Sequence, residues 1–321
     1  MAVPLMREFA ILCFTLGALA HQATALAWGD RGHRIIAAIA YEQLVPEARR
    51  EADALLADDR GDKLTAPDFI SRAAWADMLL LDRKTPSKTW YNATRFWHFA
   101  EFEIDAGTLF RACYGLRPLP SGKPASRGPA KDCVASKVEQ FAAELRDPAI
   151  DRKEKILALK FLVHLVGDLH QPLHVADNDD VFGNAIKVRP ASDLKKKSEV
   201  NLHEYWDVVL VDRALAGPDE TERAAARRIA SAFPADQVKR ALSGGPREWL
   251  LETVEVARNV VYDFSGQRRV RDGFRSSELF VDASYDARAL PAVNEQLAKA
   301  GFRLARLLNQ AFAPGQADSR Q

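Results

Sequence analysis

The chain of 321 residues has no excess of charge of either sign, because 45 Lys and Arg residues stand against 44 Asp and Glu residues, for a net charge of +1. A protein that binds a polyanion with its own side chains often carries a basic excess. If phosphate groups are bound here, we expect metal ions rather than lysines to supply most of the positive charge. The one dense basic run, Lys195–Lys197 with Lys187 nearby, is more typical of a solvated loop than of a binding patch.

Long apolar runs are also missing, since no stretch approaches the roughly 18 to 20 apolar residues that span a bilayer. The start of the chain instead has the order of a secretory signal, in which Arg7 precedes the apolar run ILCFTLGALA and the A-x-A site Ala25-Leu26-Ala27. We expect residues 1–27 to be removed after Ala27. The mature protein would then begin at Trp28, without a membrane anchor, in the periplasm or outside the cell. A retained membrane anchor is the alternative, which the short apolar run disfavours.

Cysteine is scarce as well, with three in the chain, of which Cys13 would leave with the signal. Cys113 and Cys133 remain and flank a loop rich in Pro and Gly, GLRPLPSGKPASRGPAKD. An oxidising compartment favours a disulfide between them, which would close this loop. Two free buried thiols are the alternative.

Alternating patterns typical of strands are nearly absent, and NAIKV at residues 184–188 is the only short candidate. Apolar residues instead recur every three or four positions in six segments: RIIAAIAYEQL, VASKVEQFAAEL, EKILALKFLVHLVGDL, TERAAARRIASAF, REWLLETVEVARNVVYDF and NEQLAKAGFRLARLLNQAF. This predicts an all-α protein of packed helices with long loops at 82–95, 112–132 and 176–200. Nothing divides the chain, so we expect a single domain over residues 28–312 and a disordered tail over 313–321.

The histidines are grouped rather than scattered. In FLVHLVGDLHQPLH, His164 and Asp168 are four residues apart on an apolar helix and therefore share one face. A charged aspartate in such surroundings is costly unless it is paired or bound to a cation. Pro172 ends the helix, so His174 can turn back toward the same region. This segment is a candidate metal site.

Three further segments carry residues of the same kinds. NLHEYWD repeats the four-residue spacing with His203 and Asp207, Asp77 lies in the apolar helical segment SRAAWADM, and His98 lies among aromatics in RFWHFAE. Zn²⁺ binds imidazole nitrogen and carboxylate oxygen readily, whereas Mg²⁺ and Ca²⁺ prefer oxygen alone. With His33 near the expected mature N-terminus, five histidines and three aspartates exceed what one zinc ion can bind, so the pattern indicates a cluster of two or three ions. Structural histidines with aspartates nearby by chance are the alternative.

These motifs occur in a fixed order: WGDRGH at 28–33, WAD at 75–77, WHF at 97–99, HLVGDLHQPLH at 164–174 and NLHEYWD at 201–207. Together they resemble the secreted, zinc-dependent, single-strand-specific nucleases of the S1/P1 family. AGFRLARLLN near the C-terminus is similar to that family's last helix. The resemblance extends over residues 28–312.

The resemblance implies an all-α fold related to bacterial zinc phospholipase C, with three zinc ions. By motif, the resemblance implies that Asp77, His98 and His164 bind the first ion, with Asp168 bridging it to the second. It implies that His33 and the α-amino nitrogen and carbonyl oxygen of Trp28 bind the second ion. His174, His203 and Asp207 would bind the third. A tryptophan at the cleavage point is then explained, because the free N-terminus itself is a ligand. His170, the remaining mature histidine, is expected to make hydrogen bonds behind the ligands or at the helix end.

The implied reaction is hydrolysis of the P–O3′ bond of single-stranded DNA or RNA to 5′-mononucleotides, with 3′-nucleotides dephosphorylated at the same site. Water activated between the paired zinc ions attacks phosphorus in line, and Asp77 and Asp168 are the catalytic carboxylates. Phe99 matches the family's base-stacking position. Glu101 stands where the family usually has an Asp that reads the base edge. No obligate protein partner is implied, and we expect a monomer.

Two further departures from the family pattern concern the substrate. Leu80 stands where WAD is commonly followed by an Arg, so a guanidinium is missing unless Arg72 or Arg83 replaces it. Phe182 replaces the first glycine of a Gly-Gly-Asn run and is expected to narrow or reshape the cleft. Asn184 is retained and is expected to contact the substrate phosphate. Base preference, and the choice between RNA and DNA, are left open.

Two other classes of protein fit part of this pattern. A zinc phospholipase C shares the implied fold and metals, but its pattern has a longer gap before the first histidine and a Glu as the last ligand. A periplasmic zinc-binding or scavenging protein often carries flexible His-rich loops, which this chain lacks. The motif set therefore favours the nuclease.

Overall fold

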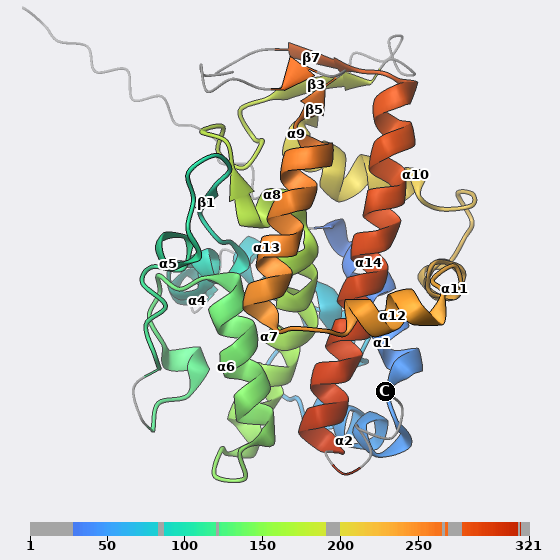
Figure 1. The fold of residues 1–321 in the computed structure, drawn as a ribbon. Helices are drawn as coiled ribbons and strands as arrows, with labels where there is room; N and C mark the ends of the chain where they lie inside the picture. Colours follow the sequence, from blue (N-terminus) through green and yellow to red (C-terminus); the bar gives the residue numbers. More distant parts are fainter. Residues whose placement is uncertain are drawn as a thin grey trace, which may run out of the picture.

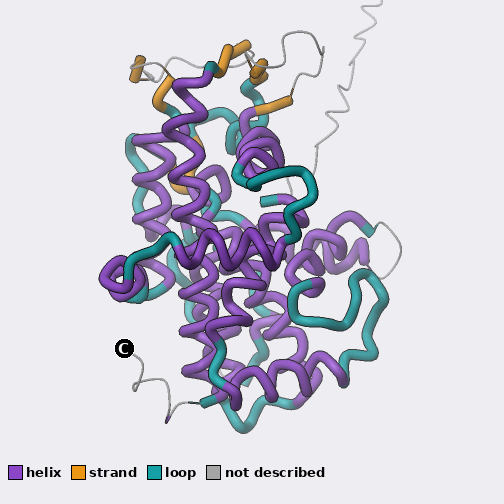
Figure 2. Tube along the Cα trace, turned by 90° about the vertical axis from the view of Figure 1, so that its right-hand side faces the viewer, coloured by secondary structure: helices purple, strands orange, loops and turns teal. Residues whose placement is uncertain are grey.

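The computed structural model describes residues 28–82, 87–119, 122–190, 200–264, 267–268, 278–313 and 315. In this part of the chain helices dominate and form one body (Figures 1 and 2), as the apolar periodicity predicts. The expected signal segment, Arg83, Lys195–Lys197 and most of the expected tail lie outside the described residues. No described helix has both the length and the apolar character needed to cross a membrane.

The helical elements are α1 (Gly29–Gln43), α2 (Pro46–Ala57), η1 (Ser71–Ala74), α3 (Trp75–Leu81), α4 (Ser87–Thr94), η2 (Arg95–His98), α5 (Leu109–Ala112), η3 (Ala125–Arg127), α6 (Val134–Arg146), α7 (Arg152–His170), α8 (Pro172–Val175), α9 (Leu202–Glu204), the π-helical η5 (Tyr205–Val209), α10 (Leu210–Arg213), α11 (Glu222–Ser231), α12 (Ala235–Ala241), α13 (Pro246–Val256), the π-helical η6 (Ala257–Val261) and α14 (Ala283–Phe312). The six periodic segments fall on α1, α6, α7, α11, α13 and α14, whereas α2 was not predicted from periodicity.

Helix α7 runs through the interior, packed against α6 and α14 (Figure 1). Its N-cap is Asp151, whose carboxylate accepts hydrogen bonds from the first free backbone N–H groups of the helix. The Phe161 ring stacks on Phe141 of α6, with ring centroids 5.1 Å apart. Every residue from 158 to 170 of α7 is buried. The turn that carries His164 and Asp168 is therefore held rigidly inside the core.

Helix α14 lies against α1 over much of its length, and a glycine permits the close approach. A Cβ atom on Gly301 would lie 2.5 Å from the Ile39 side chain of α1, closer than carbon atoms can pack. The pair fixes α1, and with it the position of Trp28 and His33 at the start of α1.

Short strands add a feature that an all-α prediction omits. β1 (Phe102–Glu103) pairs in parallel with β2 (Ala176–Asp177), β3 (Lys187–Pro190) pairs with β4 (Val200–Asn201) and β7 (Glu278–Val281), and β5 (Asp263–Phe264) pairs with β6 (Gln267–Arg268). The NAIKV candidate overlaps β3 only at residues 187–188. Strands of two to four residues are too short to show a period of two in the sequence. β3 and β7 lie across one end of the helical body (Figure 1).

The prediction of a loop over 82–95 is wrong where that stretch is described, because α4 occupies Ser87–Thr94 and η2 follows directly. A helix of eight residues makes barely two turns, too few for an apolar period to be recognised. The Thr94 hydroxyl donates to the Trp90 carbonyl at 2.8 Å in the last turn. The helix leads into η2, which places His98.

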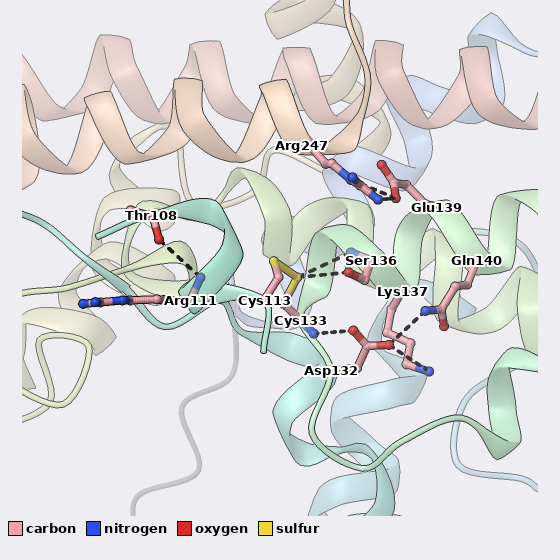
Figure 3. Close-up of a disulfide and its surroundings, with 10 residues drawn as sticks. All are labelled: Thr108, Arg111, Cys113, Asp132, Cys133, Ser136, Lys137, Glu139, Gln140 and Arg247. Carbon is pink, nitrogen blue, oxygen red and sulfur yellow. Dashed lines mark hydrogen bonds and ion pairs between the residues drawn. A yellow bond between two sulfur atoms is a disulfide. The ribbon is translucent and has the colours of Figure 1, made fainter. Parts of the chain in front are cut away.

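The expected loop over 112–132 is confirmed, and it contains only the short η3 among its described residues. Cys113 and Cys133 form a disulfide at its base, between α5 and α6 (Figure 3). Both cysteines are buried, and Cys133 is the N-cap of α6. The disulfide, rather than two free thiols, therefore joins this loop to the helical body.

Candidate metal centre

Side chains from separate elements meet in one buried region. α1, α3, η2, α7, α8, α9 and η5 each contribute one or two of the predicted histidines and aspartates, none of them more than 2% exposed: His33, Asp77, His98, His164, Asp168, His174, His203 and Asp207. They form three groups in which ligand atoms lie within 4.8 Å of one another: His33, His164 and Asp168; Asp77, His98 and His164; and His174, His203 and Asp207. Each group has the donor set of a zinc site.

Asp168 lies at the centre of the first two groups. Its Oδ1 atom is 3.3 Å from His33 Nε2, and its Oδ2 atom is 2.9 Å from His98 Nδ1 and 3.2 Å from His164 Nε2. None of these contacts has the alignment of a hydrogen bond, so both carboxylate oxygens lack a hydrogen-bond donor although they are wholly buried. A buried carboxylate in this condition requires a cation.

Asp77 is in the same condition, since both of its oxygens are buried without a hydrogen-bond donor. Asp77 Oδ1 lies 3.3 Å from His164 Nε2 and 3.7 Å from His98 Nδ1. Two ligands about 2.1 Å from one tetrahedral zinc ion are separated by about 3.4 Å. The spacings around Asp77 and Asp168 therefore fit ligands that share ions.

The orientation of three histidine rings is fixed by backbone carbonyls. The Nδ1 atom of His164 lies 2.7 Å from Ala73 O, that of His174 lies 2.9 Å from His98 O, and that of His203 lies 2.7 Å from Phe182 O. A carbonyl only accepts, so each Nδ1 carries the proton. In the neutral imidazole each Nε2 then presents a lone pair to its group, which is the usual arrangement behind a metal-ligating histidine.

His174 and His203 show the consequence most clearly. Their Nε2 atoms face each other 3.1 Å apart, while both Nδ1 protons are committed to carbonyls. Two lone pairs at this distance repel unless a proton or a metal ion lies between them. Asp207 Oδ2 completes the group 3.0 Å from His203 Nε2. The donor set of the third group thus also fits a divalent cation.

The charges in the centre depend on one another. Burial lowers the pKa of His164, but the carboxylates of Asp168 and Asp77 outweigh burial and hold that pKa well above its ordinary value. Burial raises the pKa of Asp168, but His164 and the other imidazoles outweigh it and hold that pKa well below the usual range. For Asp207, burial prevails and raises the pKa despite His203. A metal ion bound to these groups would replace the protons that otherwise balance the charge.

Trp28 lies at the edge of the third group. It is wholly buried, with a left-handed backbone at φ 50°, and its indole Nε1 donates to Gly167 O at 3.0 Å. Its backbone nitrogen donates to Asp207 Oδ1 at 3.2 Å. The structure thus places the nitrogen that signal cleavage would free in contact with one of the candidate ligands.

Two residues of the centre were missed by the sequence reasoning. Gln171 donates from its side chain to Asp207 Oδ1 and caps α8 through Leu173 N. Gly167 leaves room for the His33 ring, because a Cβ there would lie 2.6 Å from His33 Nδ1. A glycine inside an apolar helix is a signal of close packing, whereas nothing in the sequence distinguishes the role of Gln171.

His170 is not part of the centre, as expected. Its Nδ1 atom lies 2.7 Å from Val166 O within α7, and its Nε2 accepts a hydrogen bond from Arg303 of α14 at 2.9 Å. Burial, followed by the Arg303 charge, holds the pKa of His170 well below its ordinary value. The neutral ring joins the end of α7 to α14.

The expected substrate residues lie beside the third group. The half-buried Phe99 ring stacks on His174, with ring centroids 4.3 Å apart and an interplanar angle of 18°. Phe182 contacts Phe99 at 5.1 Å between ring centroids, so it lies at this edge of the site. Glu101 is exposed, and its Oε1 accepts a hydrogen bond from the Tyr114 hydroxyl at 2.8 Å.

The missing guanidinium is not supplied by Arg72. That side chain is 1% exposed and pairs with Asp59 at 2.8 Å and Asp62 at 3.4 Å, away from the candidate ligands. Asn184 is half-buried and donates from Nδ2 to Val181 O at 2.9 Å. Its carbonyl oxygen and remaining N–H are the groups it can offer a substrate.

Comparison with known proteins agrees with the site. Residues 28–313 match the family model described as S1/P1 nuclease. The chain is 27% identical to Endonuclease 2 of Arabidopsis thaliana, with 89% of this chain and 90% of that protein covered. It is 24% identical to Nuclease P1 of Penicillium citrinum, with 88% and 97% covered, and 27% identical to Nuclease S1 of Aspergillus oryzae, with 64% and 62% covered.

Proposed function

Because the chain belongs to the S1/P1 nuclease family, we propose that it hydrolyses single-stranded DNA and RNA with three zinc ions held in its three His/Asp groups. The observation that carries this proposal is the set of buried carboxylate oxygens without a hydrogen-bond donor, beside imidazole nitrogens that face one another. The bond broken is P–O3′, the products are 5′-mononucleotides, and 3′-nucleotides lose their phosphate at the same site.

The proposed ligands follow the three groups. Asp77, His98 and His164 hold the first ion and Asp168 bridges it to the second; His33 and the amino nitrogen and carbonyl oxygen of Trp28 complete the second; His174, His203 and Asp207 hold the third. The Trp28 nitrogen contacts Asp207 of the third group, so this nitrogen lies at the edge of the centre. We therefore also propose that residues 1–27 are removed on export to the periplasm or beyond, which agrees with the disulfide.

Zinc ions bound there would polarise the phosphate oxygens and lower the pKa of a water molecule at the site. The chain's own residues position the reactants. Asp77 and Asp168 have oxygens free of hydrogen-bond donors, with which they can bind cations and orient water. Phe99 presents a ring beside the third group on which an unpaired base can stack. A paired and stacked base cannot reach this ring, and this accounts for selection of single strands.

The proposal is tested on protein exported through its own signal. We expect intact-mass analysis to give an N-terminal Trp28 and elemental analysis to give about three zinc ions per chain, one for each group. Cleavage of single-stranded DNA should exceed cleavage of duplex DNA and should stop with chelator. Hydrolysis of para-nitrophenyl-phosphorylcholine without cleavage of DNA would instead indicate a phospholipase. An extension before Trp28 with three zinc ions bound would exclude Trp28 as a ligand.

A further inference from the structure

A cleft of about 400 Å³ is lined by Glu101, Glu103, Arg111, Asp177 and Phe182, among others, and Phe182 contacts Phe99. Three carboxylates and one guanidinium line it, so the cleft is unfavourable for a phosphate group. It is suited to a neutral group that donates several hydrogen bonds. A nucleobase attached to the sugar that reacts at the metal centre is such a group.

The carboxylate of Glu101 is held in place by a second residue. The Tyr114 hydroxyl donates to Glu101 Oε1 at 2.8 Å, and the backbone N of Glu101 donates to Ala112 O at 3.3 Å. Burial, followed by the hydrogen bond to Glu101, raises the pKa of Tyr114, so the hydroxyl stays protonated and remains a donor. Tyr114 follows Cys113, so the disulfide anchors it. The second carboxylate oxygen and the remaining lone pair of the first are left to accept hydrogen bonds from a ligand.

Arg111 offers the opposite chemistry in the same cleft. Its side chain extends away from the disulfide (Figure 3), and its backbone is fixed by the Thr108 hydroxyl at the start of α5. Among the described residues, no carboxylate or carbonyl binds its guanidinium. Asp177, by contrast, is already used, since its Oδ1 accepts hydrogen bonds from the backbone of Asp180 and Phe182. Glu103 also lines the cleft, but Glu101 is the carboxylate that Tyr114 holds in place, so we assign the reading of a base to Glu101 and Arg111.

We infer that this cleft prefers guanine among the four bases, an inference that rests on the proposed function. Guanine presents two adjacent donors, N1–H and N2–H₂, that match a carboxylate, and two adjacent acceptors, O6 and N7, that match a guanidinium. Adenine and cytosine each offer one amino group to Glu101, and uracil offers a single N–H. The N1–H and N2–H₂ groups pair with cytosine in a duplex, so Glu101 can reach them only in an unpaired base.

In this arrangement Tyr114 is a positioning residue, and Glu101 and Arg111 determine which base is preferred.

The test measures kcat/KM of the processed, zinc-loaded protein for phosphate release from 3′-GMP, 3′-IMP, 3′-AMP, 3′-CMP and 3′-UMP. Inosine keeps N1–H, O6 and N7 of guanine but lacks the 2-amino group. We expect 3′-GMP to exceed 3′-UMP by about tenfold or more, since a good bidentate contact discriminates by that amount, with 3′-IMP between them.

Variants assign the preference to residues. Glu101→Gln replaces one acceptor by a donor and should lower kcat/KM for 3′-GMP about tenfold with little effect on 3′-UMP. Arg111→Gln should lower the value for 3′-GMP and 3′-IMP together. Tyr114→Phe should reduce the guanine preference without abolishing hydrolysis. The matched control is Tyr41→Phe, which removes a tyrosine–carboxylate hydrogen bond to Asp53 of 2.8 Å on α1 and α2 and should leave the preference unchanged.

Equal hydrolysis of the four standard nucleotides, or an equal loss on all of them in Glu101→Gln, would overturn the inference while leaving the proposed function standing. If no nucleotide is hydrolysed, the proposed function fails, and calorimetric titration with guanosine and adenosine then decides on the cleft. Tighter binding of guanosine, lost in Glu101→Gln, supports the inference, and equal binding overturns it. Because Glu101 is exposed, loss of the fold does not confound the comparison.

Discussion

Two details distinguish this centre from a buried ion-pair network. The Nε2 atoms of His174 and His203 lie 3.1 Å apart, and the carboxylate oxygens of Asp77 and Asp168 have no hydrogen-bond donor. In an ordinary network each buried acceptor receives a hydrogen bond. Here the acceptors point at one another, and the donors that could satisfy them point outward to carbonyls. At the scale of single residues, the centre has the features of a site that could hold cations.

Gly167 tests how closely the centre is packed. Gly167→Ala places a Cβ 2.6 Å from His33 Nδ1 and 2.8 Å from His33 Cε1, so the His33 ring must move away from Asp168. We expect the purified variant to lose one zinc ion per chain and at least about tenfold in activity, measured by elemental analysis and DNA cleavage. Gly217→Ala, where a Cβ meets nothing within 4 Å, is the control. Full zinc content in Gly167→Ala would show that His33 is not required at this position.

At the residue scale, contacts between residues close together in the sequence could be predicted, whereas contacts between distant segments could not. His164 with Asp168, and His203 with Asp207, could be predicted because a spacing of four on a helix places two side chains on one face. Gln171 and Tyr114 could not, because their contacts with Asp207 and Glu101 join segments that only the folded chain brings together. Arg111 was missed for the same reason, since its cleft is shared by α5 and the loop after β2.

At the scale of elements, short pieces hold the ligands that long helices do not supply. η2 carries His98, and Ala100 N donates to His174 O at 2.8 Å, so the segment before β1 is joined to α8. These short elements could not be predicted, because two to four residues show no period. The long helices could be predicted, because their apolar residues recur with the helical period over three or more turns.

The disulfide is an element-scale constraint on stability. Cys113 and Cys133 are separated by 20 residues, and closing a loop of that length stabilises the folded state by about 3 kcal/mol through the unfolded chain. We expect the double variant Cys113→Ser with Cys133→Ser to lose about that much unfolding free energy in urea. Reducing agent should destabilise the wild type by a similar amount and leave the double variant unaffected. An unchanged midpoint in the double variant would contradict this account of the loop.

Glu144 of α6 gives the same loop a dependence on pH. Its carboxylate accepts a hydrogen bond from Ala125 N, and burial raises its pKa from 4.5 to about 7. Between these two values the folded state holds a proton that the unfolded state has released, so stability falls as pH rises from about 4.5 to 7. Glu144→Gln, whose amide oxygen can still accept from Ala125, should flatten this fall.

The measurement for Glu144 is the urea unfolding free energy at pH 5 and pH 8. The difference between the two pH values should be smaller in Glu144→Gln than in the wild type. Glu139→Gln, on the same helix in a more exposed pair with Arg247, is the matched control and should keep the wild-type difference. If Glu144→Gln keeps the full wild-type difference in unfolding free energy between pH 5 and pH 8, Glu144 is not the titrating group.

At the scale of the whole molecule, the net charge of +1 and the acidic cleft supply no excess positive charge, so the proposed function assigns the binding of phosphate to metal ions in the three His/Asp groups. The helical class and the single body were predictable from periodicity. The mutual arrangement of the helices was not predictable, because it depends on positions such as Gly301, where the absence of a Cβ atom allows one close approach among many.

Metal removal should affect the stability of the entire body, because the candidate ligands range from His33 to Asp207 and come from seven elements. Ions that bind only the folded state stabilise it by mass action. We expect chelator to lower Tm by about 10 °C or more, with recovery on adding zinc. A Tm that does not change on removal of the metal would mean that the ions, if bound, do not hold these elements together.

The most direct test of the account is anomalous diffraction at the zinc absorption edge from crystals of the processed protein. The account predicts three peaks: one between Asp77, His98 and His164; one between Asp168, His33 and the N-terminus of Trp28; and one between His174, His203 and Asp207. A single peak, or peaks outside these groups, would contradict a three-zinc centre.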